Sequence, residues 1–258
     1  MALNPAINSF LGKLYHGIIS IPLFIAYKFQ FINFKLKSRN FSKRFSLKFL
    51  DFYPCLFDKT ENTTFDAHYI YHPAWAARIL AQYKPKVHID ISSTIAFCTM
   101  LSAFINTKFY DFRPAKLDLD NLSSDHADLL SLPFDNDSIE SLSCMHVVEH
   151  IGLGRYGDPL NYDADLKAIS ELSRVVATGG NLLFVVPVGK NAKILFNAHR
   201  IYTYKQIIDY FNGFDLMEFS LVSDNGDFLR NASQKLSDEQ IYGCGCFWFK
   251  KVNNLLHD

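Results

Sequence analysis

The chain has 258 residues, 49% of them hydrophobic and 20% charged, which allows one large domain plus an extension and excludes a chain disordered throughout. Its net charge of zero hides an uneven distribution. Residues 1–50 contain eight basic residues and no acidic one, whereas the remaining 208 residues hold 18 basic and 26 acidic residues. The acidic main part disfavours nucleic-acid binding, and the basic start predicts an arm that meets a different anionic partner.

Residues 1–64 are expected to form a basic, aromatic N-terminal extension that ends in a polar junction at 51–64. Its apolar run, residues 18–27, contains Pro22 and is shorter than the roughly 20 residues that cross a bilayer. Between residues 28 and 49 six phenylalanines alternate with basic residues: Phe29, Phe31, Phe34, Phe41, Phe45 and Phe49. Such a segment either lies on an anionic membrane surface or is a helical extension whose aromatic stripe packs on the domain.

The five cysteines are scattered through the chain and odd in number. Cys244 and Cys246 stand too close for a typical zinc knuckle, and there is no second pair. This pattern favours reduced thiols in a cytoplasmic protein, peripheral on the inner membrane face if the arm binds lipid. No bound metal is expected, and the sequence gives no indication of oligomeric state.

Residues 65–258 alternate strand-like and helix-like segments, which predicts a mostly parallel sheet covered on both faces. A leading helix is expected over 73–83, with Pro73 in its first turn. Strands are expected over 87–91, 108–112, 126–129, 139–147, 182–186, 216–222 and 243–251, and helices over 94–105, 162–176 and 204–211, the second of these capped by Gly179 and Gly180. Two strands in succession at the end predict an antiparallel terminal pair.

Acidic residues end the first two of these strands. Asp90 ends the first strand, and Asp111 ends the second about 20 residues later. Ligands of open α/β sheets bind at the carboxyl ends of strands, where a carboxylate can accept hydrogen bonds from the ribose hydroxyls of an adenosine. Either residue alone could simply cap a helix or a turn, but their positions at adjacent strand ends favour a ligand site.

Further motifs follow in a fixed order. Residues 128–134 read Asp-Leu-Leu-Ser-Leu-Pro-Phe, residues 137–143 start the fourth strand with Asp-Ser-Ile, and residues 146–150 read His-Val-Val-Glu-His. This order resembles the class I S-adenosylmethionine-dependent methyltransferases, although Glu140 replaces their usual aspartate. More narrowly, HVVEHIGLGRYGDPL, GGNLLFVVPVGK and FNAHRIY resemble a methyltransferase-like family of unknown function found in nematodes and bacteria. The resemblance implies a Rossmann-like fold with a seven-stranded, mostly parallel sheet.

The resemblance also implies S-adenosylmethionine as the cofactor. It places Asp90, Ser92 and Ser93 at the methionine part, Asp111 at the ribose, Asp128 and the Leu129 amide at the adenine, and His146 beside the sulfonium. One departure matters: the loop that is glycine-rich in the family reads Ile91-Ser92-Ser93-Thr94 here. Because glycine lets backbone approach a ligand closely, this loop either binds in a modified form or has lost the site.

Residues 152–157 spell a G-x-G-x-x-G pattern, but they follow the fourth strand and precede Asp158-Pro159, so a dinucleotide fingerprint is not predicted. The loop is expected to face the acceptor. Arg155 and Tyr156, with Asn197 and Arg200, are the candidate substrate-binding residues, and His150, Asp158 and His199 the candidate catalytic ones. The alternative is an ordered surface loop in which Arg155 pairs with Asp158.

Three functions follow. The first is methyl transfer from S-adenosylmethionine to an oxygen or nitrogen of a polar, anionic small molecule or glycan, with a membrane-linked glycan intermediate as one candidate. The second is a non-catalytic binding or scaffold protein that kept the fold and lost the cofactor. The third is a zinc hydrolase, because His146, Glu149 and His150 match H-x-x-E-H, although here that pattern ends a strand rather than lying on a helix.

Overall fold

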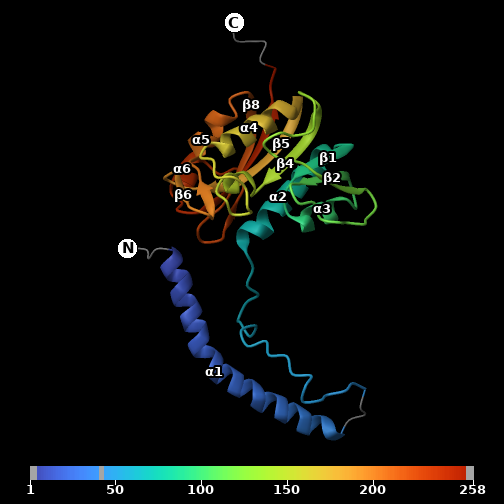
Figure 1. The fold of residues 1–258 in the computed structure, drawn as a ribbon, viewed down its shortest axis with the longest axis vertical. Helices are drawn as coiled ribbons and strands as arrows, with labels where there is room; N and C mark the ends of the chain where they lie inside the picture. Colours follow the sequence, from blue (N-terminus) through green and yellow to red (C-terminus); the bar gives the residue numbers. More distant parts are fainter. Residues whose placement is uncertain (1–4, 41–43, 254–258) are drawn as a thin grey trace. The chain divides into compact units, whose positions relative to one another are not determined.

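The computed structural model describes residues 5–40 and 44–253, with the side chains of its first helix described from residue 17 on (Figure 1). The chain divides into two compact units, Met1–Thr64 and Phe65–Asp258. Each unit is described by itself below.

The first unit is built on one long helix, α1 (Pro5–Lys37), followed by the short 3-10 helix η1 (Ser38–Asn40). Pro22 lies inside α1 without ending it. The part from Gly17 to Lys37 spans 21 residues with a mean hydropathy of 1.4 and is not buried, so its length and composition would allow it to cross a bilayer. The apolar part of the helix is therefore longer than residues 18–27, the run that the sequence analysis judged too short to cross a bilayer.

Aromatic residues of α1 pack against the segment that follows it in the same unit. The Phe24, Tyr27 and Phe31 rings lie 5.7, 4.7 and 5.5 Å from the Phe52 ring, centroid to centroid. Other rings of the predicted aromatic arm are exposed: Phe29, Phe34, Phe45 and Phe49. Phe41 and Lys43 of that arm, and the side chain of Lys13, lie outside the described residues.

The second unit is built on an eight-stranded sheet with the order β3-β2-β1-β4-β5-β10-β8-β9. Its strands are β1 (Val87–Ile91), β2 (Asn106–Asp111), β3 (Leu122–His126), β4 (Ile139–Met145), β5 (Val176–Val188), β8 (Phe214–Val222), β9 (Phe228–Leu229) and β10 (Gly243–Lys251). The first five pair in parallel, and β10 runs antiparallel to both β5 and β8. The predicted seven-stranded, mostly parallel sheet is confirmed, with two-residue β9 added at its edge.

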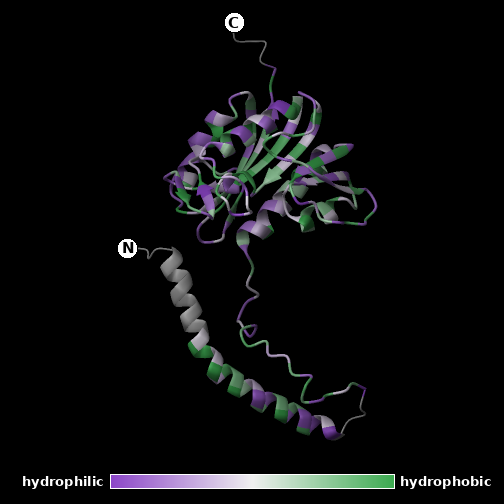
Figure 2. Ribbon diagram, viewed as in Figure 1, coloured by the Kyte–Doolittle hydropathy of each residue, from purple (hydrophilic) through white to green (hydrophobic). Residues whose placement is uncertain are grey.

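Helices cover both faces of the sheet, as predicted, and apolar residues fill the central strands (Figures 1 and 2). The helices are α2 (Ala67–Tyr83), α3 (Ile95–Leu101), η2 (Val148–His150), α4 (Ala164–Val175), α5 (Tyr204–Tyr210) and α6 (Gln234–Asp238). Along β5, Leu182 and Phe184 join the core under α4 and α5, whereas Leu183 and Val185 join the core under α2 and α3. This alternation is the period of a strand buried on both sides.

Several expected boundaries were wrong. The helix expected over 94–105 ends at Leu101, and the strand expected over 126–129 is β3, which ends at His126. Helix α2 begins at Ala67, because the Asp66 carboxylate accepts the Tyr69 N–H at 3.2 Å and caps it, so Pro73 lies inside the helix rather than in its first turn. Helix α4 ends at Val175 because Val176 is already extended and pairs with Ile139 of β4.

Gly179 and Gly180 therefore lie inside β5 and do not cap α4. A Cβ atom on Gly180 would lie 2.8 Å from the Ala177 carbonyl oxygen and 2.9 Å from that of Ile139. The second glycine is thus required by a close backbone approach rather than by a helix end.

Candidate functional site

The loop after β1 keeps a left-handed backbone although it contains no glycine. Ser92 has a φ of 56°, and its N–H donates to the Tyr110 carbonyl of β2 at 2.7 Å. The Ser92 hydroxyl donates to the same carbonyl at 3.3 Å, and Thr94 then caps α3 by accepting the Phe97 N–H. The loop therefore has a tight turn at the position where the methyltransferase pattern has glycine.

Asp90 lies inside this loop instead of at its surface. The side chain is fully buried; one carboxylate oxygen accepts the Ser93 N–H at 3.0 Å and the other is bonded to the Ser143 hydroxyl. Burial raises the pKa of Asp90 to about 6, against the hydrogen bonds from Ser143 and Ser93 that lower it. Ser93 is buried as well, and its hydroxyl accepts the Met145 N–H at 3.1 Å. Both residues thus hold the loop from within.

Asp111 and Asp128 remain at the surface of the carboxyl edge. Asp111 ends β2, is half-buried, and accepts the Arg113 N–H at 2.7 Å. Its carbonyl accepts the Ala127 N–H at 3.1 Å, which joins the ends of β2 and β3. Half-buried Asp128 accepts the Leu130 N–H at 2.8 Å, whereas the Leu129 side chain is buried in the core. Two partly exposed carboxylates therefore flank the ends of β2 and β3.

His146 follows β4 directly and is held on both ring nitrogens. Its Nδ1 lies 2.7 Å from Glu149 Oε1, and its Nε2 is hydrogen-bonded to Cys244 Sγ at 3.3 Å. Burial opposes protonation, but Cys244 and Glu149 raise the pKa of His146 to about 10. The residue adopts a φ of 58°, which turns the chain from β4 into η2.

Aromatic residues of α2 cover His146. The rings of Tyr69, His68 and His72 lie 5.3, 5.7 and 5.0 Å from the His146 ring, centroid to centroid. Burial and the nearby His146 lower the pKa of His68 to about 4 and that of His72 to about 3, so both rings are neutral at pH 7. The sequence interpretation missed these residues. His68 and His72 stand four residues apart on one helix face, which was the signal available in the sequence.

Asp158 organises the glycine-rich loop after η2. Its carboxylate accepts the N–H groups of Gly152 at 2.7 Å, Tyr156 at 3.2 Å and Gly154 at 3.3 Å. Partial burial acts to raise the pKa of Asp158, but these backbone donors lower it overall. A carboxylate with lowered pKa and several donors is a poor general base, so the predicted catalytic role is not supported and a loop-anchoring role is.

Arg155 does not pair with Asp158. Its guanidinium donates to the Ala198 carbonyl at 3.2 Å and lies 5.2 Å from the centroid of the Tyr156 ring. Both side chains are exposed, and the loop meets the segment between strands β6 (Lys193–Leu195) and β7 (His199–Ile201), two short strands that were not predicted. Arg155 and Tyr156 are thus placed where an acceptor could reach them.

His150 and His199 lie on the same rim, with ring centroids 6.3 Å apart. His150 donates from Nδ1 to the Ala198 carbonyl at 2.6 Å, which leaves Nε2 as its basic nitrogen. His199 Nε2 is buried and has no hydrogen-bond partner within the part of the chain that the structure describes. Asn197 donates to the Leu153 carbonyl at 3.5 Å. Asn197, His199 and Arg200 were expected to converge on this rim, and Asn197 and His199 lie there.

Arg200 was expected at the acceptor and is instead buried. Its guanidinium donates to the carbonyls of Ile151 at 2.6 Å and Tyr162 at 2.9 Å, and its Nε lies 3.4 Å from Asp165. These contacts join the two ends of the glycine-rich loop, and they satisfy the donors of a guanidinium that is buried. Its predicted substrate-binding role is corrected to a structural one.

Residues 121–242 match the family described as "Caenorhabditis protein of unknown function, DUF268". This agrees with the narrower resemblance noted in the sequence. None of the curated proteins compared matches the chain.

Among solved structures, one similar fold is the 1,6-didemethyltoxoflavin-N1-methyltransferase of Burkholderia thailandensis, with a TM-score of 0.51 and 10% identity over 71% of this chain and 79% of that one. The domain has the class I methyltransferase fold. A putative methyltransferase from Bacillus halodurans (TM-score 0.49, 12% identity, 70% of this chain and 99% of that one) and the N-methyltransferase NodS of Bradyrhizobium japonicum (0.47, 13%, 70% and 86%) are also similar.

In this class I fold Arg113 connects the two halves of the carboxyl edge. Its backbone N–H binds Asp111, and its guanidinium lies 5.0 Å from the centroid of the Tyr156 ring. The end of β2 is therefore adjacent to the glycine-rich loop.

Proposed function

We propose that residues 65–258 bind S-adenosylmethionine at the carboxyl ends of β1, β2 and β3 and transfer its methyl group to an oxygen or nitrogen of a polar acceptor. The observation that carries the proposal is the left-handed turn at Ser92, which a serine maintains where the family pattern has glycine. A left-handed backbone is costly for a residue other than glycine, which favours a function that fixes this loop.

The residues at the carboxyl ends of β1, β2 and β3 fit most parts of the cofactor. The half-buried Asp111 carboxylate can accept both ribose hydroxyls, and Asp128 lies at the end of the next strand, as an adenine contact requires. The Ser92 turn would hold the methionine part through its backbone. Asp90, being sealed by Ser93 and Ser143, would act on the loop and not on the ligand.

The cofactor would supply a methyl group already activated on a sulfonium. The protein then mainly has to align the acceptor with it and remove a proton where the acceptor is a hydroxyl. His150 is the candidate base, because the Ala198 carbonyl holds its Nδ1–H and its Nε2, which lies 3.7 Å from Glu149 Oε1, carries the lone pair that would accept that proton. Exposed Arg155 can pair with a carboxylate or phosphate of the acceptor.

The first unit supports a membrane-linked acceptor, for instance a glycan intermediate on a lipid. From Gly17 to Lys37 no side chain of α1 is buried and most are apolar, with Lys35 and Lys37 in the last turn. Apolar side chains next to lysines fit the boundary of an anionic membrane. This arm would bring the domain to a substrate held at the membrane surface.

Transfer of label from S-adenosylmethionine tests the proposal. The purified full chain is incubated with methyl-labelled cofactor and, separately, with a polar metabolite extract and a lipid extract, and label in each fraction is counted. We expect label in at least one fraction, a fall of about 100-fold in rate for His150→Ala with a hydroxyl acceptor, and loss for Asp111→Ala. Asp118→Ala, an exposed aspartate in the connection after β2, is the matched control.

No transfer into either extract by a folded protein would contradict the enzymatic proposal. Equal transfer by Asp111→Ala would place the cofactor elsewhere. In the first case a non-catalytic binding role would become the better explanation of the left-handed turn at Ser92.

A further inference from the structure

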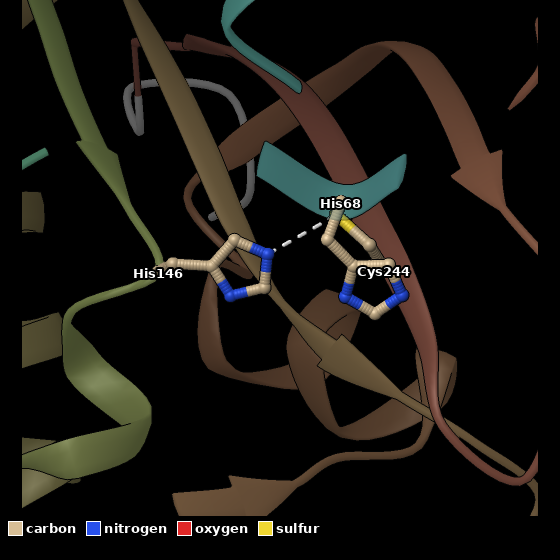
Figure 3. A group of neighbouring side chains, drawn as sticks. All are labelled: His68, His146 and Cys244. Atoms are coloured by element: carbon tan, nitrogen blue, oxygen red, sulfur yellow. Dashed lines mark hydrogen bonds between the residues drawn. The ribbon is translucent and has the colours of Figure 1, made fainter. Parts of the chain in front are cut away.

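Three side chains that can bind a metal converge beside the end of β4. His68 comes from the first turn of α2, His146 follows β4, and Cys244 lies at the start of β10 (Figure 3). One ligand atom from each lies within 4.8 Å of the other two. His68 is half-buried and the other two are buried, and His146 and Cys244 are 98 residues apart in the chain.

Imidazole nitrogen and thiolate sulfur are the ligands that Zn²⁺ prefers in proteins. His146 Nε2 and Cys244 Sγ already face one point, since a hydrogen bond of 3.3 Å joins them (Figure 3). A metal ion would take the place of the proton in that hydrogen bond, because metal binding releases protons from its ligands.

Glu149 supplies the support that a metal-binding histidine usually has. Its Oε1 lies 2.7 Å from His146 Nδ1, which fixes the ring with Nε2 directed at Cys244. Glu149 is almost completely buried, and its Oε2 has no hydrogen-bond partner among the residues described. His146 already offsets part of the cost of burying this carboxylate, and a metal ion bound to His146 would place further positive charge beside it.

His72 adds a second buried atom without a partner. It donates from Nδ1 to the His68 carbonyl at 2.7 Å, so its Nε2 carries the lone pair, and no described residue donates to that nitrogen. The His72 and His146 ring centroids are 5.0 Å apart. His72 thus fixes the turn that carries His68 and places another unused nitrogen beside the cluster.

We propose that His68, His146 and Cys244 bind a divalent transition-metal ion of the Zn²⁺ class, with Glu149 orienting His146. Three protein ligands leave a fourth coordination position for solvent or an acceptor group, as in catalytic zinc sites. This site differs from the zinc-hydrolase hypothesis based on the H-x-x-E-H pattern, because Glu149 here supports a ligand and His150 is not part of the cluster. The proposal does not depend on methyl transfer.

Cobalt substitution tests the site in the full-length protein. The metal-free chain is titrated with Co²⁺, followed by its visible bands and by the sulfur-to-cobalt charge-transfer absorption, and Zn²⁺ affinity is measured by competition with a chromogenic chelator. We expect one equivalent of Co²⁺ with a sulfur band. The band should disappear in Cys244→Ser and persist in Cys246→Ser, whose sulfur lies 3.9 Å from that of Cys244.

The affinity for Zn²⁺ should fall by more than about 100-fold in His68→Ala and by about 10- to 100-fold in Glu149→Gln. Circular dichroism of each variant checks that it is folded. Absence of Co²⁺ binding to a folded wild-type chain would overturn the proposal. So would an undiminished sulfur band in Cys244→Ser or unchanged Zn²⁺ affinity in His68→Ala, since either would place the metal elsewhere.

Discussion

Ser92 and His146 both adopt a left-handed backbone, with φ of 56° and 58°, directly after the adjacent parallel strands β1 and β4. This conformation costs a residue other than glycine about 1–2 kcal/mol. Two such residues side by side at the carboxyl edge concentrate backbone strain where the sheet presents its ligand site. Strain of this kind is found where function fixes the backbone.

Replacement of Ser92 by glycine should be tolerated and replacement by valine should not. Glycine adopts this φ without steric cost, so Ser92→Gly should stay within about 1 kcal/mol of the wild-type unfolding free energy and keep its affinity for S-adenosylmethionine. A β-branched residue is disfavoured there, so Ser92→Val should lose about 1–3 kcal/mol and bind less cofactor. Urea unfolding and a thermal-shift titration measure both; equal behaviour of the two variants would show that the turn does not matter.

Asp90 should make the protein less stable as the pH rises through the mildly acidic range. Burial raises its pKa from 3.8 to about 6, so between these values the folded state binds more protons than the unfolded chain. Its contribution is therefore fully favourable below pH 3.8 and is lost as the pH rises through about 6. Asp90→Asn does not titrate and should gain on the order of 2–3 kcal/mol over wild type between pH 4 and pH 7.

Denaturant unfolding of Asp90→Asn and wild type at several pH values measures this difference, with Asp118→Asn as the control at an exposed aspartate. Parallel pH profiles for Asp90→Asn and wild type would mean that the Asp90 carboxyl is not held inside the loop.

Replacement of Arg200 should lower the stability of the protein, whereas replacement of Arg155 should weaken acceptor binding. Arg200→Leu leaves the buried Asp165 and the Ile151 and Tyr162 carbonyls without their partner, so the unfolding free energy should fall by about 3–5 kcal/mol. Arg155→Ala removes an exposed side chain and should change it by less than about 0.5 kcal/mol while weakening acceptor binding. If Arg200→Leu were as stable as wild type but bound the acceptor less well, Arg200 would be a substrate-binding residue after all.

The first unit should bind vesicles through its lysines. In flotation with vesicles that contain anionic lipid, the full chain should float, and Lys28→Glu, Lys35→Glu and Lys37→Glu together should reduce this strongly, because each lysine near such a surface contributes about 1 kcal/mol. The same change at exposed Lys108, Lys116 and Lys167 of the domain is the control. Equal flotation of both triple variants would refute charge-driven binding, and retention after alkaline carbonate would show that α1 spans the bilayer.

The sequence predicted the sheet well because its strands carry their own signals. Strands β1 and β10 have the predicted bounds, and the apolar run of β5 was found although the strand starts six residues earlier. Strands β6, β7 and β9 have two or three residues each, too few for any period in hydrophobicity to appear. Short elements of this kind are fixed by tertiary contacts.

The site was predicted less well, because burial decides what a polar residue does. Asp90 and Arg200 have the residue types of a binding site, yet both are buried and satisfied by backbone and neighbouring side chains. His68 attracted no functional interpretation and Cys244 was not expected to bind a metal, since only the folded chain brings α2 and β10 to His146. Asp111 and Asp128 are where the strand-end argument placed them, because that argument depends on topology alone.

Calorimetric titration of the purified protein with S-adenosylmethionine and S-adenosylhomocysteine tests the central claim most directly. Wild type and Asp118→Ala should bind both ligands with micromolar affinity, and Asp111→Ala should lose at least about tenfold through the ribose hydrogen bonds. Absence of heat with a folded wild-type protein, or the same affinity in Asp111→Ala, would contradict a cofactor site at the carboxyl ends of β1 and β2.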